Sequence, residues 1–274
     1  MARQLTMKTG ILIVLGLLVL APDASSIQRR STQKPPAAPT AAPARRSERP
    51  VPFHIGETLT YDVSWSSYLS AGTAVVSVKE KRPSFDSTAY YIVAEAKPTP
   101  LLSKLYTLYY KLDTLLDAYT LLPQRGSVYT EEGNRHRLKT TRFDRRQQRV
   151  FFEYQSGNTV NSEFTVPAFT QDALSSIYVM RSIPLKAGDH MTMPVSDDGL
   201  TYRLGIDVGA PEHVKTPLGE INAWKVRPVL TDDKGQMVGK NLAVWISDDE
   251  RRYPLKIQAE LALGTFNLLL REAR

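Results

Sequence analysis

Cysteine is absent from this 274-residue chain. Its absence excludes thiolate nucleophiles, cysteine-ligated zinc, disulfides and a lipid anchor on an N-terminal lipobox cysteine. Disulfides are not needed for stability, because a domain of about 200 residues buries enough apolar surface without them. With 42% hydrophobic and 23% charged residues, the composition is typical of a globular protein and too polar for several membrane spans.

Catalytic and metal-binding motifs are also missing. The four histidines stand apart from one another, and none belongs to a metal-ligand motif: His54, His136, His190 and His213. The chain has no G-x-S-x-G or S-x-x-K sequence, and Gly235–Lys240 is one residue short of a phosphate loop. We therefore expect no metal site, no cofactor and no catalytic residue.

Two acidic clusters need separate interpretation. Asp197-Asp198 and Asp248-Asp249 lack the D-x-D-x-D-G ladder of a calcium loop and are typical of turns in which Asp bonds its own backbone. Paired carboxylates for glycoside hydrolysis stay an open alternative, because their separation of about 5–9 Å is set by the fold.

The net charge of +7 is unevenly distributed. Residues 1–50 hold eight Lys/Arg and two acidic residues, whereas the rest of the chain holds 27 Lys/Arg and 26 acidic residues. A nucleic-acid-binding domain normally carries a concentrated basic surface. Because the remainder of the chain is nearly neutral, we expect no nucleic-acid partner.

Long apolar runs are confined to Ile11–Ala21. Arg3 and Lys8 precede this run, and the small residues Ala24-Ser25-Ser26 follow it, which is the pattern of a secretory signal peptide. A run of 11 residues is short of the about 20 that span a bilayer. We expect residues 1–26 to be a signal peptide cleaved after Ser26, with no transmembrane span afterwards and a periplasmic or extracellular location.

Residues 27–50 are rich in proline, alanine and arginine and contain no aromatic residue. Such a segment cannot build a core, so we expect a disordered tether. It serves either as a solvated linker or as a spacer whose arginines contact an anionic surface.

Residues 51–274 form the expected single domain, and their main signal is alternation of apolar and polar residues at period two. Clusters of Gly, Pro, Asn and Asp separate the segments that we predict as strands. These are 59–65, 71–80, 90–96, 112–117, 126–130, 137–143, 149–154, 201–208, 221–229, 241–247, 255–263 and 265–270. The fold class is mainly β: a large antiparallel curved sheet, barrel-like or a folded-over sandwich, with one or two short helices.

Two segments predict helices. Thr170–Ile183 has Thr170 as a plausible N-cap, Arg181 in its last turn and Pro184 just beyond. Thr99-Pro100 opens a second, shorter helix, and the leucine- and tyrosine-rich residues after it are expected to cover the core. The alternative for those apolar residues is a membrane-contacting stripe.

One segment of the domain, Arg135–Arg149, concentrates positive charge. Period two places Arg135, Arg137 and Lys139 on one face of a hairpin strand, and Arg142 lies further along it. These four residues are the candidate ligand-binding residues, with anionic lipid or glycan as the ligand. The alternative is that the charges protect an exposed strand edge from aggregation.

Several motifs spread over the domain resemble a known family. They are Phe53, Gly56, Glu57, Leu59, Tyr61, Val63, Trp65, Ala71 and Gly72; Asp117, Thr120, Leu121 and Pro123; Asp172, Leu174, Ser175, Ser176, Tyr178 and Arg181; and Trp245, Ile246, Ser247, Asp248, Asp249, Arg252, Pro254 and Leu255. With these motifs the chain resembles the exported bacterial family called domain of unknown function 3108. The resemblance implies a β-rich envelope protein and no activity.

The same positions are interpretable as scaffold. We expect Gly56 and Gly72 in turns, Trp65 and Trp245 in the core, and Asp172 at a helix start.

The favoured function is a non-enzymatic cell-envelope protein that binds an amphipathic ligand or an envelope polymer, lipid or glycan, in a curved sheet. The alternatives are a carbohydrate-active enzyme with paired carboxylates and an assembly factor that pairs through a sheet edge. A lined cavity favours the first, two carboxylates in an open groove the second and a long unpaired edge the third. The oligomeric state is left open.

Overall fold

The computed structural model describes residues 47–274 except 67–68, 239–240 and 262–263. The predicted signal peptide and the predicted tether up to residue 46 lie outside the described residues. Among the described residues, Glu48 contacts the domain, with its Oε2 2.8 Å from Lys81 Nζ. The Arg49 N–H donates a hydrogen bond to the carbonyl oxygen of Ala118.

The described residues form fourteen strands and two helices. The strands are β1 (Thr58–Trp65), β2 (Leu69–Ser84), β3 (Ser87–Pro98), β4 (Leu108–Asp117), β5 (Pro123–Glu132), β6 (Arg135–Asp144), β7 (Arg149–Ser156), β8 (Asn158–Thr165), β9 (His190–Asp197), β10 (Leu200–Thr216), β11 (Gly219–Thr231), β12 (Leu242–Ser247), β13 (Pro254–Leu261) and β14 (Gly264–Ala273). The helices are α1 (Pro100–Leu105) and α2 (Ala173–Ser182).

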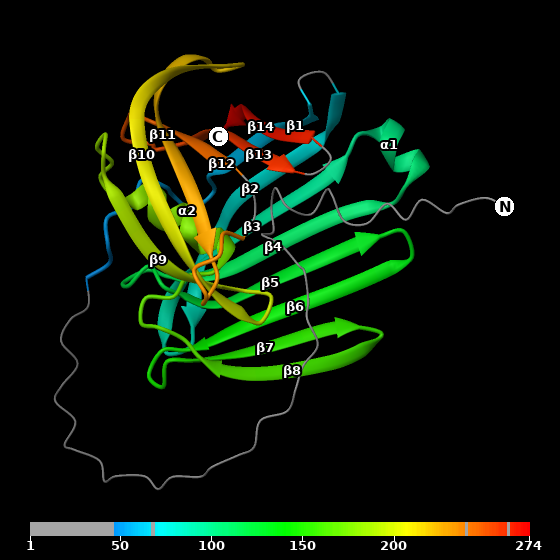
Figure 1. The fold of residues 1–274 in the computed structure, drawn as a ribbon, viewed down its shortest axis with the longest axis vertical. Coiled ribbons are helices and arrows are strands. Elements are labelled where there is room, and N and C mark those ends of the chain that lie inside the picture. Colours follow the sequence, from blue (N-terminus) through cyan, green and yellow to red (C-terminus); the bar gives the residue numbers. More distant parts are fainter. Residues whose placement is uncertain (1–46, 67–68, 239–240, 262–263) are drawn as a thin grey trace, which may run out of the picture.

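All fourteen strands belong to one antiparallel sheet in the order β8-β7-β6-β5-β4-β3-β2-β1-β14-β13-β12-β11-β10-β9. The chain runs outward from β1 to β8, passes through α2, and returns from β9 to β14, which pairs with β1. No described ladder joins β8 to β9, so the curved sheet is not closed (Figure 1). The predicted fold class, a large antiparallel curved sheet with short helices, is confirmed.

Helix α2 lies in the curve of the sheet, between the two halves of the molecule (Figure 1). Met180 packs into the core cluster built mainly from β9–β14, whereas Leu174 and Tyr178 pack into the cluster built from β2–β4. One short helix therefore fills the concave side of both halves and holds them together by apolar burial.

A buried ion pair fixes the C-terminal end of α2. The Arg181 guanidinium donates to both carboxylate oxygens of Glu57 at 2.7 and 2.8 Å, and each side chain is 1% exposed. Arg181 also donates to the carbonyl oxygens of Arg251 and Arg252. Burial opposes the charged guanidinium, but its hydrogen bonds to Glu57 raise the pKa of Arg181 above the ordinary value. The two charges are thus paired and hydrogen-bonded, as a buried pair requires.

Of the two predictions for the start of α2, Asp172 at the helix start is confirmed and Thr170 as the N-cap is wrong. The N-cap is Asp172 and not Thr170: Asp172 Oδ1 accepts from the Ser175 N–H at 2.7 Å, and the Ser175 hydroxyl oxygen accepts from the Asp172 N–H. The Thr170 hydroxyl instead donates to the Pro167 carbonyl oxygen. Gly126 makes room for this cap, because a Cβ there would lie 2.9 Å from Asp172 Oδ2.

Two strands were not predicted. The eight residues of β8 follow a turn-like Gly157-Asn158 pair and are almost all exposed, so they carry no apolar alternation. β9 ends at the turn residues Asp197-Asp198 and contains Pro194. Both strands lie at the ends of the sheet, where a one-sided or solvated strand needs few apolar residues.

Three scaffold predictions are corrected. Gly72 lies inside β2 and not in a turn; a Cβ there would lie 2.1 Å from the Lys97 carbonyl oxygen, so close strand approach requires glycine. Trp65 is only half-buried and stacks on Phe266, with ring centroids 6.0 Å apart. Of the leucine- and tyrosine-rich segment expected to cover the core, β4 does so with Leu112 and Leu116, but α1 does not, since none of its residues is buried.

Candidate functional site

The ladder between β11 and β12 is short. These strands pair only over Ala223–Val226 and Val244–Ser247. Continued in the same register, the ladder would place Pro228 opposite Leu242, but proline has no N–H to donate. Further along, the carbonyl oxygen of Leu230 accepts from Val238 instead of from β12. Beyond Val226 the two strands separate, and we call this opening the split.

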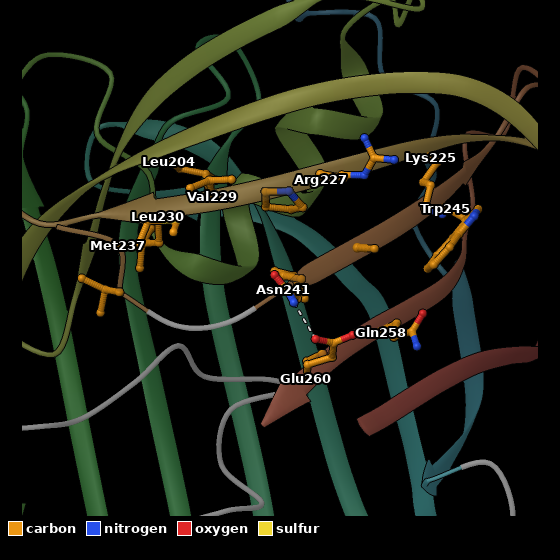
Figure 2. A pocket seen from close by; sticks show the side chains of 15 residues that line it. Leu204, Lys225, Arg227, Val229, Leu230, Met237, Asn241, Trp245, Gln258 and Glu260 are labelled. Atoms are coloured by element: carbon orange, nitrogen blue, oxygen red, sulfur yellow. Dashed lines mark hydrogen bonds between the residues drawn. The ribbon is translucent and has the colours of Figure 1, made fainter. Parts of the chain in front are cut away.

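A cavity of about 350 Å³ occupies the split. Its lining comes from β10, β11, β12, β13 and the segment between β11 and β12: Leu204, Lys225, Arg227, Pro228, Val229, Leu230, Met237, Val238, Asn241, Leu242, Ala243, Trp245, Gln258, Ala259 and Glu260. Figure 2 shows Lys225, Arg227 and Trp245 at one end of the cavity, and Leu204, Leu230 and Met237 at the other. The cavity therefore has a basic, aromatic end and an apolar end.

The basic end is organised around the Trp245 ring. Lys225 Nζ lies 5.0 Å and Lys256 Nζ 4.6 Å from the ring centroid. The indole N–H donates to Glu212 Oε2 at 2.9 Å, and Glu212 Oε1 accepts from Lys225 at 3.1 Å. Arg227 is exposed and makes no ion pair within the described part of the chain. Three cations thus lie around one carboxylate, and two of them, Arg227 and Lys256, form no ion pair with any described residue.

Electrostatics at this end favour an added negative charge. Burial lowers the pKa of Lys256, and repulsion from Lys225 lowers it further. The hydrogen bond from Trp245 lowers the pKa of Glu212, and the one from Lys225 acts in the same direction. An anion bound beside Lys256 would offset the repulsion between the two ammonium groups.

Behind the split lies a second, apolar cavity of about 90 Å³, next to α2 inside the curved sheet. The two cavities share three lining residues, Leu204, Pro228 and Leu242. They therefore lie on either side of the same side chains. The split is thus separated from the hydrophobic interior only by Leu204, Pro228 and Leu242.

The candidate residues of the basic hairpin lie on β6, away from the split. Arg137 donates to Glu132 at 2.9 Å, and Lys139 Nζ lies 2.5 Å from Asp198 Oδ1. Arg142 stacks on the Phe151 ring with its guanidinium 4.3 Å from the centroid. Arg135 is exposed at the start of the strand.

Ligand binding by these four residues stays a prediction. The structure brings none of them to the split.

The remaining motif residues occupy structural positions. Gly56 has a φ of +91°, which favours glycine. Asp248 accepts from the Trp224 indole N–H at 2.7 Å, and Pro254 opens β13. Tyr61 is fully buried beside the ion pair of α2, where burial raises its pKa.

A second cluster of charged residues lies where the β9–β10 turn contacts β6 and β7, and we call this contact the seam. Its cavity measures only about 30 Å³ and is lined by Asp172, Asp197 and Asp198 among others. Burial and the neighbouring Asp198 raise the pKa of Asp197 to about 7. A space of this size holds roughly one water molecule and no sugar ring. The described residues therefore offer these carboxylates no open groove.

Two further observations limit the chemistry. No three His, Asp or Glu side chains of the described residues are grouped so that they would hold a metal ion. No helix within the described ranges is long and apolar enough to cross a membrane.

Comparison with known proteins identifies the family. The family model described as "Protein of unknown function (DUF3108)" matches residues 60–271. This chain belongs to the DUF3108 family. No curated protein matches the chain.

Solved structures resemble the DUF3108 chain at low identity. A β-barrel-like protein of domain DUF1849 from Brucella abortus is 12% identical, with a TM-score of 0.49 over 80% of this chain and 97% of that one. A candidate exported protein with a YmcC-like fold from Bacteroides fragilis is 12% identical, with a TM-score of 0.34 over 83% and 100%. A candidate lipoprotein from Parabacteroides distasonis is 9% identical, with a TM-score of 0.32 over 83% and 100%.

Sequence reasoning missed the split in this DUF3108 protein, although one signal was present. Pro228 interrupts an otherwise regular strand pattern, and proline within a strand marks a place where the ladder to one neighbour is missing. The charges of Lys225, Arg227 and Lys256 gave no comparable signal, because they are distributed over β11 and β13, which the fold places on either side of β12.

Proposed function

We propose that this protein is a non-enzymatic, exported envelope protein that binds a single-chain amphiphile with an anionic head group in the split. The observation that carries the proposal is the polarity of the cavity. One end is basic and aromatic, and Leu204 at the other end also lines the apolar cavity inside the curved sheet. Ligand sites are commonly apolar cavities with a few placed polar groups.

The head group would lie at the basic end. Arg227 lacks an anionic partner among the described residues and offers a planar, multidentate donor for a carboxylate or phosphate. Lys256 gains from a bound anion because its own pKa is lowered by burial and by Lys225. The face of Trp245 provides apolar area next to these charges.

The apolar chain would follow the split inward. Leu204, Pro228 and Leu242 line both cavities. An alkyl chain that displaces water from the outer cavity therefore reaches the side chains that form the wall of the inner cavity. The outer volume of about 350 Å³ is near the lower end of the range of ligand sites. This size fits one short chain better than a two-chain lipid or a polymer.

The predicted export of this protein supports a ligand that is found in the cell envelope. The apolar run Ile11–Ala21, with basic residues before it and small residues after it, has the pattern of a signal peptide. Single-chain amphiphiles with carboxylate or phosphate head groups are products of envelope lipid turnover, and the proposed site matches that chemistry.

Calorimetric titration with dodecanoate and with 1-dodecanol tests the proposal, because the two ligands share a chain and differ in charge. We expect dodecanoate to bind more tightly. The variant Arg227→Glu should weaken dodecanoate binding by about tenfold, the effect of losing roughly 1.4 kcal/mol. The matched control is Arg203→Glu, since Arg203 is exposed on β10 and does not line the cavity.

A second variant tests the path of the chain. Leu242→Trp fills the space between the two cavities and leaves every charge in place. It should abolish binding of both ligands. Binding of dodecanoate that is unchanged in both Arg227→Glu and Leu242→Trp would refute the site.

A further inference from the structure

Helix α1 exposes a group of apolar side chains. Leu101 is 71%, Leu105 78% and Tyr106 54% exposed. The helix lies at the rim of the sheet between β3 and β4, held by the Thr99 side chain at its start and a hydrogen bond from the Thr99 N–H to the Ala71 carbonyl oxygen (Figure 1). Core packing therefore does not explain why this helix carries Leu101 and Leu105.

The turn between β5 and β6 adjoins this helix. A Cβ on Gly133 would lie 3.5 Å from the Tyr106 ring, so the two segments are in contact. We define the rim patch as Leu101, Lys104, Leu105, Tyr106 and Arg135. It contains three apolar and two basic side chains.

The carboxylates nearby are already engaged. Glu132 accepts from Arg137 and from the Tyr110 hydroxyl, and Glu131 accepts from the Tyr129 hydroxyl. Lys104 and Arg135, in contrast, are exposed and form no ion pair with any described residue. The rim patch thus presents apolar side chains together with uncompensated positive charge.

We propose that the rim patch docks on an anionic phospholipid surface. Leucine and tyrosine side chains enter the boundary between head groups and acyl chains, while Lys104 and Arg135 contact phosphates. A protein partner fits less well, because two leucines on a six-residue helix and one tyrosine at its C-cap offer much less than the about 800 Å² that a stable protein interface buries on each partner. The proposal is independent of the ligand site in the split.

The absence of cysteine allows a local test on the full chain. Ser103→Cys places a single thiol on the exposed side of α1, where an environment-sensitive fluorophore is attached. We expect its emission to shift to the blue on vesicles of phosphatidylethanolamine and phosphatidylglycerol, and much less on phosphatidylcholine. The same label at Gln147→Cys, in the β6–β7 turn at the opposite end of the strands, should not respond.

Surface variants identify the groups responsible. Leu101→Ser combined with Leu105→Ser should reduce vesicle partitioning of the Ser103 label by about tenfold or more, from the apolar area lost. Lys104→Glu combined with Arg135→Glu should remove the preference for anionic vesicles. Leu200→Ser is the matched control, because Leu200 is 50% exposed on β10 and lies outside the patch.

The residues changed are exposed, so the variants should keep the circular dichroism spectrum and dodecanoate affinity of the parent chain. Residues 11–21 are common to all variants and cannot produce a difference between them. A Ser103 label that does not respond to anionic vesicles overturns the proposal. So does an equal response in the parent and in the double-leucine variant.

Discussion

The split and the seam are both places where main-chain pairing is missing, but side chains close only one of them. At the seam, Lys139 pairs with Asp198. The Phe152 ring packs so closely against Gly199 that a Cβ on this glycine would lie 3.0 Å from the ring. The cavity that remains is about 30 Å³, against about 350 Å³ at the split. At the split, no described main-chain bond joins Pro228 to Leu242, and the cations around Trp245 outnumber their partners.

The difference separates a closed gap from a candidate binding site. A gap in a sheet is structural when the side chains across it satisfy each other, because nothing is left to gain from a ligand. A gap whose polar groups lack partners and whose apolar groups face water gains free energy when a ligand fills it. At the seam, Lys139 and Asp198 satisfy each other and little space remains; we propose that the split is a gap of the second kind.

The largest expected effect concerns α2, which lies behind both openings. Arg181→Met leaves Glu57 as a buried, unpaired carboxylate and should lower the free energy of unfolding by about 3–5 kcal/mol. Denaturant titration measures the loss. The double variant Glu57→Leu with Arg181→Met removes both charges and should recover most of the stability. If the single variant loses less than about 1 kcal/mol, α2 is not held by this pair.

The seam should depend on pH through Asp197, whose pKa is raised from 3.8 to about 7 by burial and by Asp198. Between these values the folded protein binds a proton that the unfolded chain releases, so stability should fall as the pH rises from about 4 to 7 and then level off. Asp197→Asn removes this loss and should stabilise the protein by up to about 4 kcal/mol at pH 8, at about 1.4 kcal/mol per pKa unit, and little at about pH 4.

Thermal unfolding over this pH range, with Asp233→Asn as the control at an exposed position, measures the effect. Equal pH profiles for the parent and Asp197→Asn would show that the seam does not titrate. Dodecanoate binding at the split should be the same in Asp197→Asn and in the parent.

The smallest effect on stability should come from Pro228→Val, which gives β11 an N–H at the position opposite Leu242. If the proline keeps the split open in the parent, one more hydrogen bond forms between β11 and β12 in the variant and contributes about 1 kcal/mol to the free energy of unfolding. Amide exchange should show a protected N–H at position 228 of the variant, and dodecanoate affinity should fall as the cavity narrows. An N–H at this position that exchanges freely, with affinity unchanged, means that other residues hold the split open.

Much of the fold was predictable because its signals are local. Alternation in segments such as Leu59–Trp65 requires a strand with one buried face, and Pro184 after Arg181 requires a helix to end. The family resemblance was also carried by local motifs and is confirmed. The polar edge strand β8 escaped prediction because burial does not constrain its sequence.

The sequence by itself determined a β-rich domain with one capped helix, because periodicity and capping act over a few residues. Only the tertiary structure decided which charges meet. Glu57 and Arg181, 124 residues apart, form the buried pair, whereas Arg137 and Lys139 of the basic hairpin are engaged by acidic partners. Lys225 and Lys256 come together at Trp245 because β11, β12 and β13 are neighbours. Sheet order and register set such distances, and no local pattern encodes them.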